Sequence, residues 1–222
     1  MLAITARAYR WMHLITSRAK HRTLQAHLSG INHRRPLRVL DLGCGPGQNA
    51  SLFDDRRRFS YLGVDQDRRC IAVAQDLHPL DFKVADATRL NVGYDRYDIV
   101  LMNSLLHHLD DSQVCGLMQM ARGALAEDGE CLLLDMVHPP QKSISNVISR
   151  ALIKLDRGRY CRSESALEAH FEPYFRIHSK DRFAIRFAGW LLWDMRFYCL
   201  QTSELDPGVA TGLKTTGDVQ RR

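Results

Sequence analysis

A glycine-rich segment at residues 38–47 (RVLDLGCGPG) constrains the fold more than any other part of this sequence. The apolar pair Val39 and Leu40 precedes Asp41, and glycine then stands at positions 43, 45 and 47. An apolar run of this kind is typical of a buried parallel strand, and glycine lets the backbone turn tightly beside a ligand. We expect a short helix over residues 48–54. The segment therefore predicts strand, loop and helix, the first unit of a nucleotide-binding α/β sheet.

The glycine spacing discriminates between classes of ligand. The dinucleotide fingerprint is G-x-G-x-x-G, but here Gln48 occupies its third glycine position. Asp41 would repel a pyrophosphate, whereas a carboxylate can bind the ammonium group of an amino-acid ligand, directly or through water. The pattern acid-x-G-x-G-x-G resembles the first motif of the class I S-adenosylmethionine (SAM) methyltransferases. This resemblance implies SAM as the cofactor, bound by Asp41 and by the loop residues Gly43, Cys44, Gly45 and Gly47.

Two further acids stand at the ends of predicted strands. Asp65 ends the apolar strand 61–65, and a carboxylate there is placed to accept both ribose hydroxyls. Its alternative role is a helix N-cap, and Gln66 is predicted to pack on the adenine face. Asp86 ends a strand at residues 82–86. The resemblance implies that Asp86 accepts the adenine amino group and that the Ala87 N–H bonds a ring nitrogen; the alternative for Asp86 is a turn residue.

The fourth predicted strand, residues 97–102, leads into Asn103 and the run LLHHL at residues 105–109. In the resembling family this strand end meets the methionine part of SAM and the methyl acceptor, which implies a cofactor contact for Asn103. The run is similar to the corresponding segment of small-molecule methyltransferases such as the quinone-biosynthesis group. His107 and His108 are therefore candidate catalytic bases, because imidazole titrates near neutral pH. The alternative is that one of the pair packs against the core; further candidates are Tyr9, His138 and Tyr160.

The resemblance implies an α/β fold: a Rossmann-like, seven-stranded, mostly parallel sheet with helices on both faces and a C-terminal antiparallel hairpin. Residues 1–35 are expected to form a basic amphipathic helical cap and residues 36–137 the SAM-binding core. Within the core, Asp111 and Ser112 are predicted to cap a helix over residues 113–125. A turn at residues 126–130 then leads into a fifth strand, residues 131–137.

Residues 138–202 complete the predicted domain with an insert that covers the acceptor and with two strands. We expect an insert helix over residues 142–155 and a second helix over residues 163–174, where Ser165 and Glu168 have capping-box spacing. A strand pair follows at residues 175–187 and 194–201, and the tail, residues 203–222, is expected to be disordered.

Composition restricts the expected compartment and binding partners of the protein. None of the six cysteines is spaced as C-x-x-C, which predicts reduced thiols in a cytoplasmic protein without disulfides and without a metal site. No apolar run reaches the roughly 18 residues that a membrane span needs. Residues 1–40 carry eight Lys and Arg and no acid. We interpret this segment as a helical cap; the alternatives are a docking surface for an acidic carrier protein, a membrane-surface helix, a nucleic-acid contact or a transit peptide.

The motifs also narrow the acceptor. Asn103 is followed by Ser104 and two leucines, which lack the [N/D]-P-P-[Y/F] pattern of enzymes that methylate amino groups. We therefore expect O- or C-methylation of a small molecule: a quinone-, polyketide- or fatty-acyl-like acceptor. Nucleic acid is disfavoured, because the aromatic residues near the basic segment are too few to stack bases. Two alternatives remain: a SAM-binding protein with non-methylating chemistry, and an RNA methyltransferase.

Overall fold

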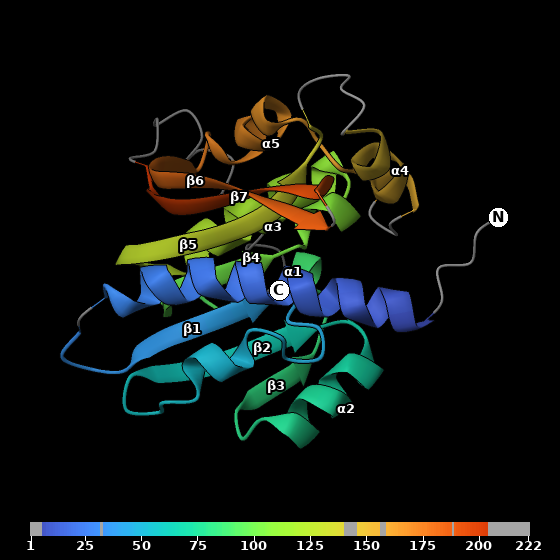
Figure 1. Cartoon of the computed structure of the whole chain (residues 1–222). Coiled ribbons are helices and arrows are strands. Elements are labelled where there is room, and N and C mark those ends of the chain that lie inside the picture. Colours follow the sequence, from blue (N-terminus) through green and yellow to red (C-terminus); the bar gives the residue numbers. More distant parts are fainter. Residues whose placement is uncertain (1–5, 32, 140–145, 156–158, 188, 204–222) are drawn as a thin grey trace, which may run out of the picture.

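The computed structural model describes residues 6–31, 33–139, 146–155, 159–187 and 189–203, with only the backbone course given for residues 6–16 (Figure 1). Its centre is a seven-stranded sheet of order β3-β2-β1-β4-β5-β7-β6. Strands β1 to β5 pair in parallel, whereas β7 pairs antiparallel with both β5 and β6. This arrangement confirms the predicted fold. The strands are Leu37–Leu42 (β1), Phe59–Asp65 (β2), Asp81–Val84 (β3), Tyr97–Asn103 (β4), Leu125–Val137 (β5), Phe175–Phe187 (β6) and Trp190–Thr202 (β7).

Five helices and three short 3₁₀ turns connect the strands in the described part of the chain. Figure 1 shows α1 across one face of the sheet, and α3 lies on the other. The helices are Ala6–Ser29 (α1), Arg68–Leu77 (α2), Asp111–Ala124 (α3), Val147–Leu155 (α4) and Glu164–Phe171 (α5), and the turns are Ala50–Phe53 (η1), Ala87–Arg89 (η2) and Leu106–His108 (η3). No helix in these ranges is both long and apolar enough to cross a membrane.

Side chains on alternate positions of each central strand fill the two halves of the core, because successive residues of a strand point to opposite faces. Leu40 and Leu42 of β1 lie in one cluster with residues of α3, whereas Val39 lies in the other with Leu24 and Leu28 of α1. Leu24 is completely buried, so α1 is more than a solvated cap. Its C-terminal half is one of the layers that the sheet needs to cover its apolar face.

In the first half of the core, one predicted helix was wrong and one helix was missed. The helix expected over residues 48–54 is only the single turn η1, because the Asn49 side chain bonds the buried Asp41 and the half-buried Asn103 and does not cap a helix. Helix α2 was not predicted at all. It buries Ile71 and Ala74 and leaves Val73 and Leu77 exposed; its apolar residues do follow a helical spacing, which the sequence analysis overlooked.

Three further expectations were wrong in the second half. Helix α3 begins at Asp111 rather than 113, because Asp110 caps it in a capping box with Gln113. The expected turn at residues 126–130 belongs to β5, where a bulge absorbs the extra residues opposite β4. Helix α5 is capped by Ser163, whose hydroxyl accepts a hydrogen bond from the Ala166 amide, and not by Ser165 with Glu168. Residues 142–145 of the predicted insert helix and residues 204–222 of the tail lie outside the described residues.

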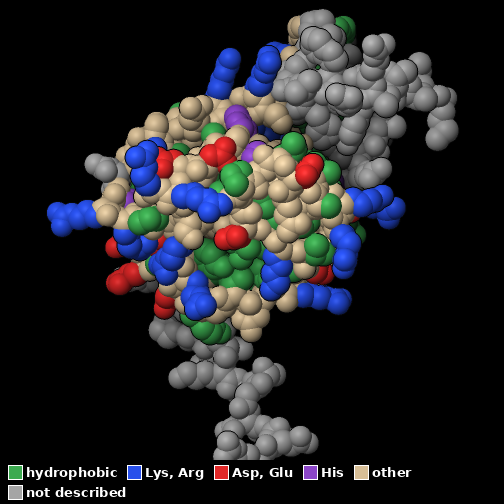
Figure 2. Space-filling model, turned by 90° about the horizontal axis from the view of Figure 1, so that it is seen from below, with side chains coloured by type: hydrophobic (Ala, Val, Ile, Leu, Met, Phe, Trp, Pro, Cys, Tyr) green, Lys and Arg blue, Asp and Glu red, His purple; other side chains and the backbone are tan. Residues whose placement is uncertain are grey.

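Figure 2 views the molecule from the side of β3 and α2 and shows hydrophobic side chains in its middle, with lysines and arginines scattered around them. The large hydrophobic residues that stay exposed include Val73 and Leu77 of α2 and Val84 of the edge strand β3. The basic side chains on this face do not gather into one continuous patch.

A buried ion network holds the C-terminal hairpin to α5. Arg196 is 2% exposed, and its guanidinium lies 2.7 Å from the completely buried Asp194 and 2.7 Å from Glu164. Arg182 approaches the same Asp194 carboxylate from the surface at 2.9 Å. The hydrogen bond from Arg196, together with bonds from Lys180, lowers the pKa of Glu164 to about 2. Burial of two opposite charges is stable here because each carboxylate oxygen has a donor.

We expect Arg196→Met to lower the free energy of unfolding by about 3 kcal/mol, because Asp194 would remain buried with half of its compensation removed. Urea denaturation followed by circular dichroism measures the loss. Arg57→Met is the control outside the network: its side chain is 94% exposed beside the exposed Asp55, so its loss should stay at or below about 1 kcal/mol. Equal losses in the two variants would contradict this account of the network.

Candidate active site

The predicted site residues converge where the parallel strands β1 to β5 end. Asp41 lies near the end of β1, Asp65 ends β2, Asp86 follows β3 and Asn103 ends β4. In an open α/β sheet, ligands bind at the carboxyl ends of the strands, in the crevice beside the strand where the order reverses. The order β3-β2-β1-β4 places that reversal between β1 and β4. The topology therefore brings to one edge residues that are up to 62 positions apart in sequence (from Asp41 to Asn103).

The glycine loop adopts a conformation that side chains rarely allow. Gly43, Gly45 and Gly47 have φ angles of 71°, 55° and 81°, all in the left-handed region that favours glycine. A Cβ on Gly43 or Gly47 would collide with a neighbouring side chain, whereas a Cβ on Gly45 would meet no atom within 4 Å. Hydrogen bonds from the Gly43 and Cys44 amides to the Val64 carbonyl tie the loop to β2. The open backbone face at Gly45 is a surface that a ligand such as SAM can approach closely.

Asp65 is placed to serve both the loop and a ligand. One of its carboxylate oxygens accepts a hydrogen bond from the Gly45 amide at 2.9 Å, and the other accepts one from the Asp67 amide at 2.8 Å. A carboxylate has about four acceptor sites, so capacity remains on both oxygens of this half-buried side chain. The alternative role of Asp65 as helix N-cap is taken by Asp67, which caps α2.

Asp86, Ala87 and Gln66 lie beside Asp65 at the mouth of the site. One Asp86 oxygen accepts hydrogen bonds from the amide and the hydroxyl of Thr88, so Asp86 caps η2. The hydrogen bond from the Thr88 hydroxyl is the largest influence that lowers the pKa of Asp86, which therefore stays ionised. Ala87 is half-buried and begins η2, and Gln66 is exposed. These positions are compatible with the predicted adenine contacts.

Asp41 does not lie where the sequence analysis expects it. Sequence analysis expects it to bind the ammonium group of the ligand, directly or through water, whereas the structure buries it completely. One oxygen accepts hydrogen bonds from the Tyr61 hydroxyl at 2.8 Å and the Asn49 amide at 3.3 Å, and the other has no hydrogen-bond partner among the described residues. Asn49 in turn accepts a hydrogen bond from Asn103 at 2.9 Å. The chain Asn49–Asn103 therefore links Asp41 to the end of β4.

The environment of Asp41 favours its protonated form. Burial raises the pKa of Asp41 to about 7, and the hydrogen bonds from Tyr61 and Asn49 offset only part of that effect. The negative charge of nearby Asp65 raises it further. Near neutral pH this carboxyl group is therefore divided between its two charge states.

His107 and His108 have different environments. His107 is 4% exposed, and its Nδ1 lies 2.5 Å from a carboxylate oxygen of Asp135, whereas His108 is exposed. The two rings lie 4.1 Å apart. Asp135 is buried in β5 and also accepts hydrogen bonds from the Leu106 and His107 amides. Burial alone would raise the pKa of Asp135, but the imidazole of His107 outweighs it and the pKa is lowered.

Asp135 was missed by sequence analysis, although a signal is present. It is the single polar residue in the run CLLLDMV at residues 131–137, and a buried acid inside an apolar strand needs a specific partner. The structure identifies this partner as His107. Of the lesser candidates, Tyr160 donates a hydrogen bond from its backbone amide to the His107 carbonyl, and its side chain is exposed. His138 is also exposed. The side chain of Tyr9 lies outside the described residues.

Lys20 is a second residue that sequence analysis did not single out. Its Nζ lies 2.5 Å from the Ser104 hydroxyl, which donates to Asn103. Lys20 also contributes to the lowered pKa of Asp135. The spacing of Lys20, Leu24 and Leu28 is four residues, so the lysine lies on the apolar face of α1. A lysine at a position of the apolar face is unusual, and this could have marked Lys20 as a candidate from the sequence.

The comparisons with known proteins agree with this geometry. The sequence model of the family described as "Methyltransferase domain" matches residues 7–182. No match is found among the curated proteins.

Three solved structures share the fold at low sequence identity. A protein from Pyrococcus horikoshii has a TM-score of 0.65 at 17% identity, covering 90% of this chain and 93% of its own. A SAM-dependent methyltransferase from Methanosarcina mazei has a TM-score of 0.63 at 15% identity, covering 78% and 95%. A TehB-like SAM-dependent methyltransferase from Corynebacterium glutamicum has a TM-score of 0.61 at 16% identity, covering 89% and 96%.

The position of Asp65 predicts the effect of its removal on SAM affinity. We expect Asp65→Ala to weaken SAM binding by roughly 10- to 150-fold, since a partly buried charged hydrogen bond is worth about 1.5–3 kcal/mol. Isothermal titration calorimetry measures the affinity. Asp67→Ala is the control, because it removes an acid two residues away that bonds Arg69 and points to solvent. Affinity that is unchanged in Asp65→Ala, or equally reduced in both variants, would remove Asp65 from the site.

Asp41 predicts a pH dependence of stability. Its pKa is about 7 in the folded chain and about 4 in the unfolded chain, so between these values the folded state binds more protons. The free energy of unfolding should therefore fall as pH rises from about 4 to about 7. In Asp41→Asn, which keeps the shape and lacks the titration, this contribution should be absent. Denaturation at several pH values measures both proteins, and parallel pH profiles would contradict the prediction.

Proposed function

This chain belongs to the methyltransferase domain family and uses S-adenosylmethionine as cofactor, and from this premise we propose that it methylates a hydroxyl group of a small molecule. Bound SAM supplies a methyl group that the sulfonium charge has already activated. The protein then has three tasks: to align the acceptor oxygen, to exclude water and to take up the proton of the hydroxyl. The residues at the ends of β4 and β5 support an assignment for the last of these tasks.

The contact between His107 and Asp135 carries the proposal. An ionised carboxylate can only accept a hydrogen bond, so the Nδ1 atom 2.5 Å from Asp135 must carry the proton. The Nε2 atom is then the basic nitrogen of the neutral ring. When Nε2 takes up a proton, the buried charge of Asp135 compensates the imidazolium. Each turnover would thus leave the methyl group on the acceptor oxygen and a proton on His107.

Lys20 supports a hydroxyl acceptor that develops negative charge. Its ammonium group reaches Ser104, the residue directly after β4, and exerts its field on Asp135. A positive charge at this edge favours the oxyanion that forms as the acceptor loses its proton. Phenolic hydroxyls of quinone- or polyketide-like compounds fit this environment best. The same proposal also covers a fatty-acyl-like acceptor. It also covers an acceptor that an acidic carrier protein delivers to the site.

The setting that we propose is biosynthesis in the cytoplasm. All six cysteines lie within the described residues and are free thiols, as expected of a reducing compartment. The alternatives make different demands on the site. Non-methylating SAM chemistry does not need a base held by a carboxylate, and methylation of RNA would need a basic surface, which Figure 2 does not show on the face near β3.

Methyl transfer from labelled SAM tests the proposal. We expect label to enter organic-extractable products when the protein is incubated with an extract of the source cells, and not to enter added RNA. Label recovered mainly in RNA, or no transfer at all, would contradict it. The labelled product then identifies the acceptor for kinetic work.

With that acceptor, His107→Ala should lower kcat by roughly 10²- to 10⁴-fold, with little change in the affinity for SAM. Asp135→Asn should also lower kcat, because an amide can hold the opposite tautomer of the ring. His108→Ala is the matched control and should stay near the wild-type rate, since its ring is exposed. Equal rates for the His107 and His108 variants would exclude this base.

A further inference from the structure

Three metal-ligating side chains meet at the end of the sheet opposite the active site. His27, Glu130 and Cys199 offer one nitrogen, one oxygen and one sulfur atom that all lie within 4.8 Å of one another. One carboxylate oxygen of Glu130 lies 2.8 Å from His27 Nε2 and 2.7 Å from Cys199 Sγ. The three atoms thus converge on a common point.

Each of the three comes from a different element, and each element fixes its position. His27 lies in the last turn of α1, and its ring packs edge-on against Phe197 of β7 with centroids 5.5 Å apart. Glu130 lies on β5 directly opposite Gln201 of β7, in the register that also sets Cys199 opposite Leu132. Cys199 is completely buried, and the side chains of His27 and Glu130 are each 20% exposed. The cluster is therefore built into the fold and is reachable from one side.

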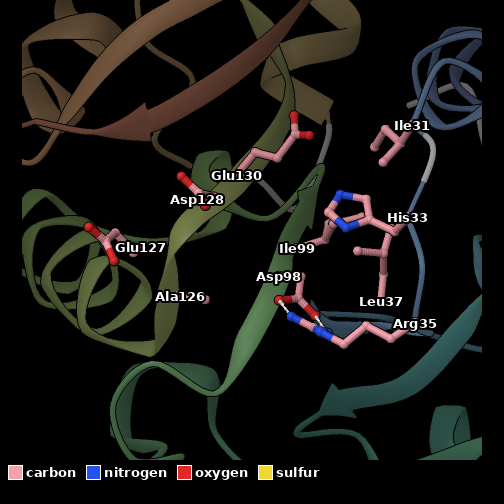
Figure 3. Close-up of a pocket in the computed structure, with 10 residues that line it drawn as sticks. All are labelled: Ile31, His33, Arg35, Leu37, Asp98, Ile99, Ala126, Glu127, Asp128 and Glu130. Carbon is pink, nitrogen blue, oxygen red and sulfur yellow. Dashed lines mark hydrogen bonds and ion pairs between the residues drawn. The ribbon is translucent and has the colours of Figure 1, made fainter.

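A cavity of about 340 Å³ adjoins the cluster at Glu130, the one of the three ligands that lines it. Glu130 lines it together with Ile31 and His33, and Figure 3 shows these residues along its wall, with the paired side chains of Arg35 and Asp98 at its base. The cavity lies beside Leu37 and Asp98, at the starts of β1 and β4, and so is remote from the strand ends that form the active site. Water and small ions can reach the cluster through it.

We propose that His27, Glu130 and Cys199 bind a zinc ion, with water from the cavity in the fourth position. Imidazole, carboxylate and thiolate are all zinc ligands, and a site with three protein ligands and one water is a common form of zinc coordination. The sulfur and nitrogen donors disfavour calcium and magnesium, which select oxygen. The geometry needs a small adjustment: tetrahedral zinc sets its ligand atoms about 3.3–3.6 Å apart, so Glu130 would move back by less than 1 Å.

Two other roles fit the cluster less well. A nucleophilic cysteine requires a positive environment that favours the thiolate, but the charge next to Cys199 is the carboxylate of Glu130. A plain hydrogen-bonded network is the remaining alternative, and the experiment below separates it from a metal site. Sequence analysis predicted no metal site because it looked for closely spaced cysteines. The three ligands stand at positions 27, 130 and 199, and only the fold joins them.

A zinc ion here would cross-link the C-terminal end of α1 to strands β5 and β7. Strands β5 and β7 are already paired, so the ion would chiefly add a tie between them and α1, which contacts them through apolar side chains and the His27–Glu130 pair. Zinc should therefore stabilise the folded chain by mass action, since the unfolded chain does not hold the three ligands together. The proposal assigns the ion no part in methyl transfer.

Binding of zinc to the whole, tag-free protein tests the proposal directly. The protein is first stripped with a chelator and then titrated with Zn²⁺ in competition with a chromophoric chelator. We expect one equivalent to bind and to raise the melting temperature. Titration with Co²⁺ should give the thiolate-to-cobalt charge-transfer band, which reports on cysteine ligation. No binding at one equivalent, or binding of cobalt without that band, would overturn the proposal in favour of the hydrogen-bonded network.

Variants assign the ligands. His27→Gln and Cys199→Ser should each weaken zinc binding by about tenfold or more and abolish the zinc-dependent rise in melting temperature. His27 is partly exposed, so its variant remains informative if the buried Cys199 variant fails to fold. Cys70→Ser, which removes a partly exposed thiol elsewhere, is the control and should bind zinc as the wild type does. Unchanged zinc affinity in folded His27→Gln would also overturn the assignment.

Discussion

Parallel pairing of β1 with both β2 and β4 is the constraint on which the rest of the structure depends. Parallel strands present their carboxyl ends at one edge, so this pairing alone places the glycine loop between Asp65 and Asn103. It also buries β1 on both sides, and Asp41 with it. The buried carboxyl group in turn takes the Asn49 side chain away from helix capping, which is why the loop ends in the single turn η1.

The aspartates near the strand ends look alike in the sequence, but the structure buries them to different degrees, and this separates their roles. Asp65 and Asp86 stay partly exposed and keep acceptor capacity toward the crevice. Asp41 is buried with one oxygen lacking a partner among the described residues, and its pKa rises to about 7. Asp135 is buried too, but the His107 imidazole outweighs the effect of burial and its pKa is lowered. The difference is the charge that the His107 imidazole can place beside Asp135, whereas Asp41 has only the neutral partners Tyr61 and Asn49.

Local patterns predicted the sheet and the strand-end acids well, because β1, β2 and β4 are short apolar runs bounded by glycine or by an acid. They failed where a contact distant in sequence decides the outcome. The cap of α3 and the bulge in β5 depend on geometry that neighbouring residues only partly encode. His107 could be named from its motif, but its difference from His108 could not, since only the fold brings Asp135 to one of the two rings. Lys20 was counted with the basic residues of the first segment, although its position on the apolar face of α1 sets it apart.

Helix α1 links the two ends of the sheet. Lys20 and His21 contact Ser104 and the Gln48 carbonyl beside the glycine loop, and His27 contacts Glu130 at the opposite end. His27 follows Lys20 by seven positions, a rise of about 10 Å, and Leu24 anchors the helix between them in the core. A rigid helix fixed at Leu24 keeps these two contacts in register. The position of the Lys20 charge at the end of β4 therefore depends on packing and polar contacts along the whole described C-terminal half of α1, and not on the active-site loops alone.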